Sequence, residues 1–191
     1  MSKEVVANTL KKLGWPDAAI NATLGNIAVE TGGTFDYKIK QKGGPGYGLF
    51  QFDFFKPYYQ KWLKQNKMKD SPQAQATFYH DTIYGDSQNI LGAGRAAELR
   101  KAIETQDNPA ILADTLAKDW FRPAEHRNPG YAQRVQYAQQ FSGVPAQKVS
   151  TKRTAPMQQS DGVIQEQPMP YEGENPLLHN PLMDAVRSWF K

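Results

Sequence analysis

Proline and glycine breaks divide much of this chain into short segments with helical periodicity. Proline is favoured in the first turn of a helix and glycine just beyond its end, so such breaks mark helix boundaries. The breaks fall at Ser71-Pro72, Gly85, Gly92, Asn108-Pro109 and Asn128-Pro129. The sequence therefore predicts helices over roughly 54–67, 71–84, 94–105, 108–121 and 129–142.

The first 33 residues predict two more helices. Residues 3–13 show an apolar face that stops at Gly14, and Asp17 is placed to cap a second helix. One stripe at helical spacing runs along that second helix: Ile20, Leu24, Ile27 and Thr31. Gly32 or Gly33 then ends the helix, because glycine accepts the left-handed conformation of a C-terminal cap.

Residues 35–53 change to an alternating pattern. The segment "FDYKI" over 35–39 is followed by the turn-rich "QKGGPG" and then by "YGLFQFD" over 47–53. Two alternating runs around a Gly-Pro turn predict a small β-hairpin. The expected fold class is therefore α+β and mainly α, a helical domain with a small β-hairpin, followed by an extended C-terminal tail.

The composition changes after Val144-Pro145. Residues 146–176 are rich in Gln, Pro and Ser, which predicts an extended linker between a domain at 1–145 and the chain's last segment. In residues 177–191 several apolar side chains share one helical face: Leu182, Met183, Val186, Trp189 and Phe190. So short a helix is unstable alone, so we expect a docking peptide, with a frayed tail as the alternative.

The net charge of +4 lies entirely in the first 147 residues, where 18 basic side chains stand against 14 acidic ones. Such a field favours an anionic partner, whether nucleic acid, a membrane surface or a wall polymer. The absence of cysteine excludes disulfides and thiol chemistry. We expect no transmembrane segment and no signal peptide, so that something other than the standard export route would deliver the protein.

Glu30 stands at an unfavourable place, the C-terminal end of the second predicted helix. The negative end of the helix dipole costs an exposed carboxylate about 0.3–1 kcal/mol. Burial beside Ile27, three residues earlier, would disfavour the ionised form further. These conditions suit a general acid, although a single glutamate at a helix end is more often a solvated side chain. The segments that follow Glu30 decide between the two.

Three segments together resemble the lysozyme-like superfamily, most closely the phage tail lysozymes and more distantly goose-type lysozymes and lytic transglycosylases. They are "AAINATLGNIAVETGGTF", "GGPGYGLFQFD" and "DWFRPAEHRNPGYAQRVQYAQQF", within residues 15–143. In that superfamily a catalytic glutamate ends a helix, and a Gly-Leu/Ile-X-Gln motif follows on a strand. Glu30 and Gly48-Leu49-Phe50-Gln51 match these motifs. Thr31 stands where serine is commoner, and Phe50 replaces a methionine.

The resemblance implies cleavage of the β-1,4 bond between N-acetylmuramic acid and N-acetylglucosamine in peptidoglycan. Glu30 would protonate the bridging oxygen, and Gln51 would bind the substrate or orient a water. Further substrate-binding candidates are Thr31, Tyr47, Phe50 and Tyr131. The implied setting is a phage virion, as a tail or ejection protein, with action in the host periplasm or cell wall and residues 177–191 contacting another virion protein.

The second catalytic group stays open. Asp36 and Asp53 bracket the predicted hairpin, and either could activate a water or form a covalent intermediate, depending on its distance from Glu30. Each could equally be a turn residue that bonds nearby backbone. Some members of the superfamily use a single glutamate and the substrate's own N-acetyl group, so both a hydrolase and a transglycosylase are possible outcomes.

Other constellations are weaker. "GGPGYG" lacks the Lys-Ser/Thr of a phosphate loop, and the three histidines have no ligand spacing, so we expect no cofactor and no metal. The many lysines before residue 70 carry no nucleic-acid recognition motif, and a solvated face or affinity for an anionic wall polymer explains them equally. The alternative function is a structural tail or ejection protein that keeps the fold without catalysis.

Overall fold

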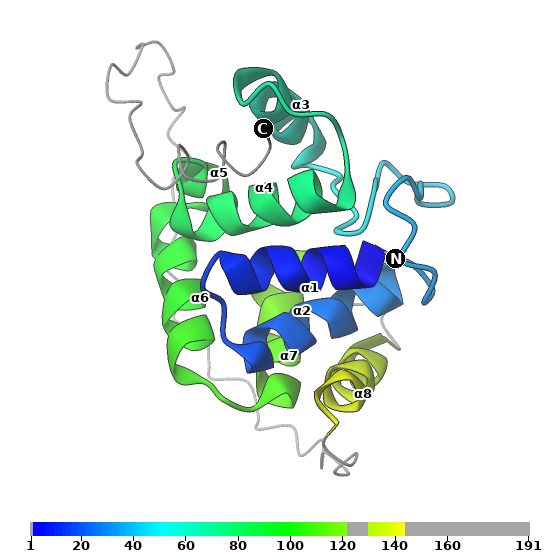
Figure 1. The fold of residues 1–191 in the computed structure, drawn as a ribbon, viewed down its shortest axis with the longest axis vertical. Coiled ribbons are helices and arrows are strands. Elements are labelled where there is room, and N and C mark those ends of the chain that lie inside the picture. Colours follow the sequence, from blue (N-terminus) through cyan, green and yellow to red (C-terminus); the bar gives the residue numbers. More distant parts are fainter. Residues whose placement is uncertain (1, 122–129, 144–191) are drawn as a thin grey trace, which may run out of the picture. The chain divides into compact units, whose positions relative to one another are not determined.

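The structure, a computed structural model, describes residues 2–121 and 130–143, which are mainly helical (Figure 1). The helices are α1 (Ser2–Lys12), α2 (Asp17–Glu30), α3 (Lys56–Gln65), α4 (Pro72–Tyr84), α5 (Gln88–Leu91), α6 (Ala93–Thr105), α7 (Pro109–Leu116) and α8 (Gly130–Ser142), with a π-helical segment η1 (Ala117–Phe121) after α7. All seven predicted helices are present within a few residues. The predictions for 146–176 and 177–191 lie outside the described residues.

Local capping explains several helix starts. The Ser71 hydroxyl accepts a hydrogen bond from the Ala74 amide, and the Asn108 side chain accepts one from Ala110, each just before a proline in the first turn. The expected cap at Asp17 is wrong, because Pro16 holds that position and α2 has no side-chain cap. The short helix α5 was not predicted, since four residues carry too little periodicity.

Helix α2 is the centre of the helical packing. Residues 22–28 are buried without interruption, because α1, α7 and α8 all contact this helix. The predicted stripe is buried, but burial extends around the helix well beyond it. Helix α2 therefore lies where several helices meet.

Gly25 lets α8 approach α2 closely. A Cβ at this position would stand 2.6 Å from the Arg134 carbonyl oxygen and 2.8 Å from the Ala138 amide nitrogen. Both atoms belong to the backbone of α8, so neither can move aside without moving the helix. The absence of a side chain at Gly25 thus sets the position of α8 against α2.

The β-hairpin that the sequence predicts over residues 35–53 does not form. Residues 35–53 form turns with a single antiparallel bridge between Lys40 and Tyr47, and no strand forms in them. Left-handed backbone at Gly48, with φ of 75°, and at Gln51, with φ of 47°, interrupts any extended run. The side chains also fail to alternate between core and solvent, because consecutive residues Leu49 and Phe50 are both buried.

Aromatic packing fixes this loop to the helices. The Phe50 ring lies 4.7 Å from that of Tyr79 on α4, and the Phe52 ring lies 5.5 Å from that of Phe78. Phe50 also meets Trp120 of η1 at 5.8 Å between ring centroids. The loop over residues 35–53 is thereby held by the packing of buried aromatic rings, where a β-hairpin would be held by hydrogen bonds between strands.

Substituting alanine for Gly25 should push α8 away from α2. In Gly25→Ala the added methyl group meets backbone at less than 3 Å, so we expect a loss of about 1–3 kcal/mol in the free energy of unfolding. Gly94→Ala in α6 is the control, because a Cβ there has open space. Urea unfolding measures both, and equal stability of the two variants would contradict the close approach.

The buried His80 should make stability depend on pH. Its Nδ1 accepts a hydrogen bond from the Trp15 indole at 2.8 Å, and burial lowers the pKa of His80 to about 4. The unfolded chain, with a histidine pKa of about 6.5, then binds the extra proton first. Stability is therefore fully present above pH ~6.5 and falls by about 1.4 kcal/mol per unit down to the folded-state pKa.

Urea midpoints measured from pH 7.5 to 4 test this dependence against His80→Gln, which keeps an acceptor for Trp15. We expect the wild type to lose more stability than the variant between about pH 6.5 and 4. Parallel curves for the two proteins would show that His80 does not carry the dependence.

Candidate active site

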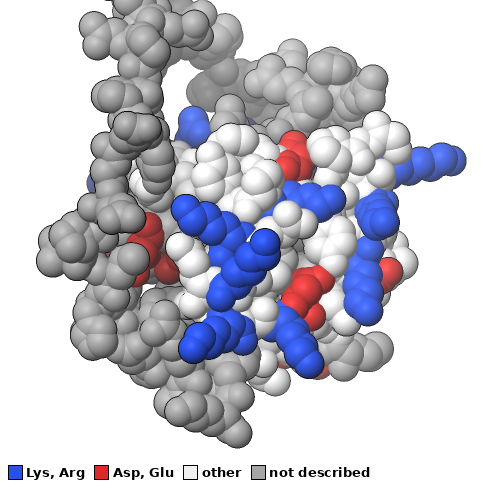
Figure 2. All heavy atoms as spheres, turned by 90° about the horizontal axis from the view of Figure 1, so that it is seen from above, with Lys and Arg blue, Asp and Glu red and all other residues white. Residues whose placement is uncertain are grey.

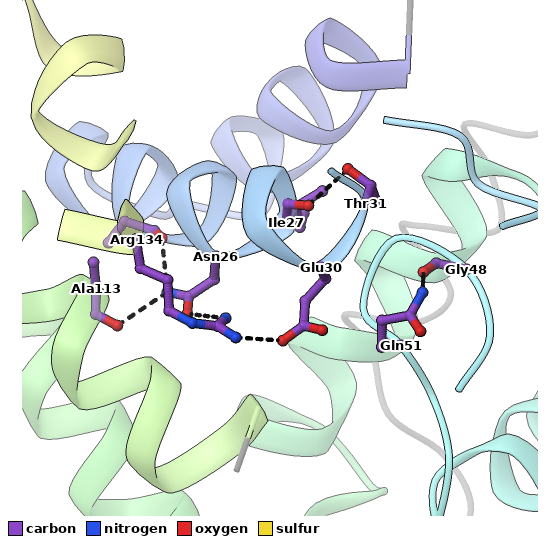
Figure 3. Close-up of polar contacts among 9 residues, drawn as sticks. Asn26, Ile27, Glu30, Thr31, Gly48, Gln51, Ala113 and Arg134 are labelled. Carbon is purple, nitrogen blue, oxygen red and sulfur yellow. Dashed lines mark hydrogen bonds and ion pairs between the residues drawn. The ribbon is translucent and has the colours of Figure 1, made fainter. Parts of the chain in front are cut away.

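Glu30 is the last residue of α2 and forms an ion pair with Arg134 of α8 (Figure 3). The Arg134 Nη2 atom lies 2.7 Å from Glu30 Oε1. The arginine side chain is 3% exposed and that of the glutamate is 19% exposed. Solvent therefore reaches the side chain of Glu30 but scarcely reaches the arginine that pairs with it.

Asn26 holds the other end of the guanidinium. Arg134 Nη1 donates to Asn26 Oδ1 at 2.8 Å, and Asn26 Nδ2 donates to the carbonyl oxygens of Ala22 and Ala113 at 3.0 Å each. Asn26 and Glu30 are four residues apart, so they lie on one face of α2 and share one arginine. The group ties α2, α7 and α8 together directly behind Glu30.

The Arg134 guanidinium orients the carboxyl group of Glu30. A guanidinium at hydrogen-bond distance fixes the direction of Oε1. Among the described residues Glu30 Oε2 has no hydrogen-bond partner. The described residues thus orient the carboxyl group of Glu30 through Oε1 alone.

Phe121 of η1 connects this ion pair to the loop that follows α2. The Arg134 guanidinium lies 5.7 Å from the centre of the Phe121 ring, and the Phe50 ring lies 6.1 Å from it on a nearly parallel plane. The arginine that pairs with Glu30 and the Gly-Leu-Phe-Gln loop therefore approach the same aromatic ring.

The loop's predicted site residues have different surroundings. Gln51 is half-buried, and its Nε2 donates to the Gly48 carbonyl at 2.9 Å, which turns the amide back onto its own loop (Figure 3). Phe50 is 2% exposed, so its ring is part of the hydrophobic core and a substrate cannot contact it. The Tyr47 hydroxyl donates to Asp70.

Asp70 and Gln75 hold this loop in place. The Tyr59 hydroxyl donates to Asp70 Oδ1 at 2.7 Å, and Gln75 Nε2 donates to the same oxygen at 3.0 Å. Gln75 is fully buried, and its Oε1 accepts from the Leu49 amide at 2.8 Å. Burial, together with the hydrogen bond to Asp70, raises the pKa of Tyr59 well above its usual range. Tyr59 therefore remains a protonated donor.

The structure places the other predicted residues around these groups. Thr31 is buried, and its hydroxyl donates to the Ile27 carbonyl at 2.8 Å while accepting from the Phe35 amide, so it shapes the end of α2. Tyr131 lies in the first turn of α8, three residues before Arg134, and is half-buried. This spacing puts Tyr131 on the face of α8 that carries Arg134.

Asp36 and Asp53 are both exposed and bond locally. Asp36 Oδ1 accepts from the Lys38 amide at 2.9 Å, and Asp53 accepts from the amide of the next residue, Phe54. Neither carboxylate forms a hydrogen bond or ion pair with Arg134. Within residues 2–121 and 130–143, no group of three or more His, Cys, Asp or Glu side chains is placed to hold a metal ion.

Sequence reasoning missed Arg134 and Phe121 as parts of the site. Arg134 follows Glu30 by 104 residues, and no local pattern pairs them. One signal was available, because Arg134 falls four residues before the buried Ala138, on the apolar side of a predicted helix. A charged side chain on such a face needs a partner in the core.

A family model for phage tail lysozymes matches residues 2–144. The chain belongs to the phage tail lysozyme family. The resemblance seen in residues 15–143 is confirmed, and the match also includes α1. The protein is therefore lysozyme-like and virion-associated, with a function related to peptidoglycan. A comparison with curated proteins gives no match. In the described part of the chain, no helix has the length and apolar character of a membrane span.

The Glu30–Arg134 pair should couple energetically. A double-mutant cycle of Glu30→Gln and Arg134→Gln, measured by urea unfolding, isolates the pairwise term. We expect a coupling energy of about 1–3 kcal/mol, because the arginine is buried and loses its counter-charge in the first variant. The exposed pair of Lys118 and Asp114, at 2.6 Å, is the control and should couple by about 0.3–0.5 kcal/mol. Additive effects of the two substitutions on the free energy of unfolding would show that Glu30 and Arg134 do not interact.

Proposed function

We propose that this protein is a virion-associated peptidoglycan glycosidase that opens the host cell wall locally during phage genome entry. It would cleave the β-1,4 bond between N-acetylmuramic acid and N-acetylglucosamine with Glu30 as the acid. The observation that carries this proposal is the carboxyl group of Glu30. Its Oε1 is held by the buried Arg134, and its Oε2 has no hydrogen-bond partner among the described residues. A carboxyl group that is 19% exposed, is oriented through one oxygen and keeps the other free of protein partners suits a general acid.

In this mechanism Glu30 gives its proton from Oε2 to the bridging oxygen as the glycosidic bond breaks. The leaving sugar departs as an alcohol, and the other sugar develops oxocarbenium character. The carboxylate that remains on Glu30 is stabilised by Arg134, whose position is set before the reaction by Asn26. A preformed charge of this kind helps most when the negative charge develops, so it lowers the barrier.

The surroundings of the two aspartates favour a mechanism with a single protein carboxylate. Asp36 and Asp53 are exposed and accept hydrogen bonds from nearby backbone amides, which is the behaviour of turn residues. The substrate's N-acetyl group would then stabilise the oxocarbenium ion. Either water or the substrate's own 6-hydroxyl group would complete the reaction, giving a reducing sugar or an anhydro sugar.

Digestion of purified sacculi tests the proposal. The wild type should release muropeptides, and Glu30→Gln should release at least about a hundredfold less, as expected for loss of a general acid. Mass spectrometry of the products separates the two outcomes, because the anhydro sugar lacks one water. If the wild type releases nothing, even without residues 148–191, the protein is a structural member of its family.

Asp36→Asn and Asp53→Asn are the matched controls, since each also replaces one carboxylate by an amide. We expect both to keep activity within about tenfold of the wild type, because neither group acts on the substrate. Near-ultraviolet circular dichroism checks that Glu30→Gln is folded. A loss at Asp36 or Asp53 as large as that at Glu30 would make that aspartate the second catalytic carboxylate.

A further inference from the structure

The positive charge of the domain is concentrated in one stretch of sequence. Residues 36–71 contain eight lysines and three carboxylates, a net charge of +5, whereas residues 1–147 as a whole carry +4. The eight are Lys38, Lys40, Lys42, Lys56, Lys61, Lys64, Lys67 and Lys69. The rest of the domain is therefore slightly acidic, and the cationic stretch coincides with the loop after α2 and with α3.

Helix α3 and the turn after it form the most one-sided part of this stretch. Residues 56–69 contain five lysines and no carboxylate. Lys61, Lys64, Lys67 and Lys69 are exposed, and none pairs with a carboxylate among the described residues. Figure 2, which looks down on the α3 end of the domain, shows basic side chains gathered with few acidic ones among them. These charges are not used to stabilise the fold.

Two aromatic rings stand in solvent at the start of the same helix. Phe54 is 59% exposed and Tyr58 is 41% exposed, with 5.4 Å between the ring centroids. Phe54 also contacts the buried ring of Phe55, which anchors the pair. Farther along α3 a shallow depression is lined by Gln60, Leu63, Lys64, Lys67 and Met68. Exposed rings beside unpaired charges are typical of a binding surface.

We infer that this cationic–aromatic face, residues 54–69, binds an anionic glycan strand of the cell wall at a distance along the polymer from the bond that is cleaved. The lysines would meet carboxylates on the strand's peptide stems, and the rings of Phe54 and Tyr58 would pack against the apolar faces of sugar rings. The inference rests on the proposed function for its choice of polymer. Its role would be to keep the enzyme on an insoluble substrate between cleavage events.

The composition of the face favours an acidic glycan over nucleic acid or a membrane. All seven arginines of the chain lie outside residues 36–71. Arginine is the residue of choice for nucleic-acid recognition, whereas lysine acts as a compact point charge that pairs with any anion. Two exposed rings are enough to contact neighbouring sugars but give little apolar area for insertion into lipid.

Cosedimentation with purified sacculi tests the inference. All proteins carry Glu30→Gln, so that binding is measured without digestion. Lys64→Gln with Lys67→Gln should weaken binding by at least about fivefold, and Phe54→Ala with Tyr58→Ala should weaken it by a similar factor that persists at high salt. The control, Lys11→Gln with Lys101→Gln, removes the same charge from α1 and α6 and should bind within about twofold of its parent.

Unchanged binding by the lysine and aromatic variants would overturn the inference, as would equal weakening in the control. The same proteins are also tested with duplex DNA and with vesicles that contain phosphatidylglycerol. If the substitutions weaken binding only to DNA or only to vesicles, the face serves that other partner and the inference fails. Because no step depends on catalysis, a protein that binds sacculi through this face but releases no muropeptides would refute the proposed function alone.

Discussion

The rest of the site depends on the hydrogen bonds that the buried guanidinium of Arg134 donates to Asn26 and Glu30. A charge with 3% of its side chain exposed is tolerated only when nearby groups satisfy it. Asn26 and Glu30, one turn apart on α2, supply an amide oxygen and a carboxylate to two of its nitrogens. Arg134 in turn fixes the direction of Glu30. Stability and the proposed chemistry therefore depend on the same contact. Helix α8 must lie close to α2 to place Arg134 beside Glu30, which explains why position 25 is a glycine.

The loop after α2 is held in an equally definite way, although it has no regular structure. Gln75 binds the Leu49 amide and also reaches Asp70, which accepts hydroxyl groups from Tyr47 and Tyr59. The Phe121 ring then joins the loop to Arg134. The loop is thus connected through Phe121 to the arginine that pairs with Glu30, without a β-sheet.

The helices could be predicted because their signals are local. A proline after Ser71 or Asn108 marks a helix start in the sequence itself, and Glu30 before Gly32 marks a helix end. The two larger failures, the hairpin and the partner of Glu30, are non-local. The expected hairpin does not form because the buried Gln75 and the aromatic core impose turns that alternation cannot reveal, and Phe50 enters the core for the same reason. The partner of Glu30 lies 104 residues away, so no local pattern pairs the two, although the place of Arg134 on an apolar helix face indicates that it needs a partner.

The most direct test of this account is a crystal structure of Glu30→Gln with a bound glycan fragment of alternating N-acetylglucosamine and N-acetylmuramic acid. We predict that the bridging oxygen lies about 2.6–3.2 Å from the side-chain nitrogen that replaces Oε2 at position 30. We also predict that the contact between Arg134 and Asn26 is unchanged. A fragment bound away from the C-terminal end of α2, with position 30 covered by protein, would contradict the central claim that Glu30 is the acid.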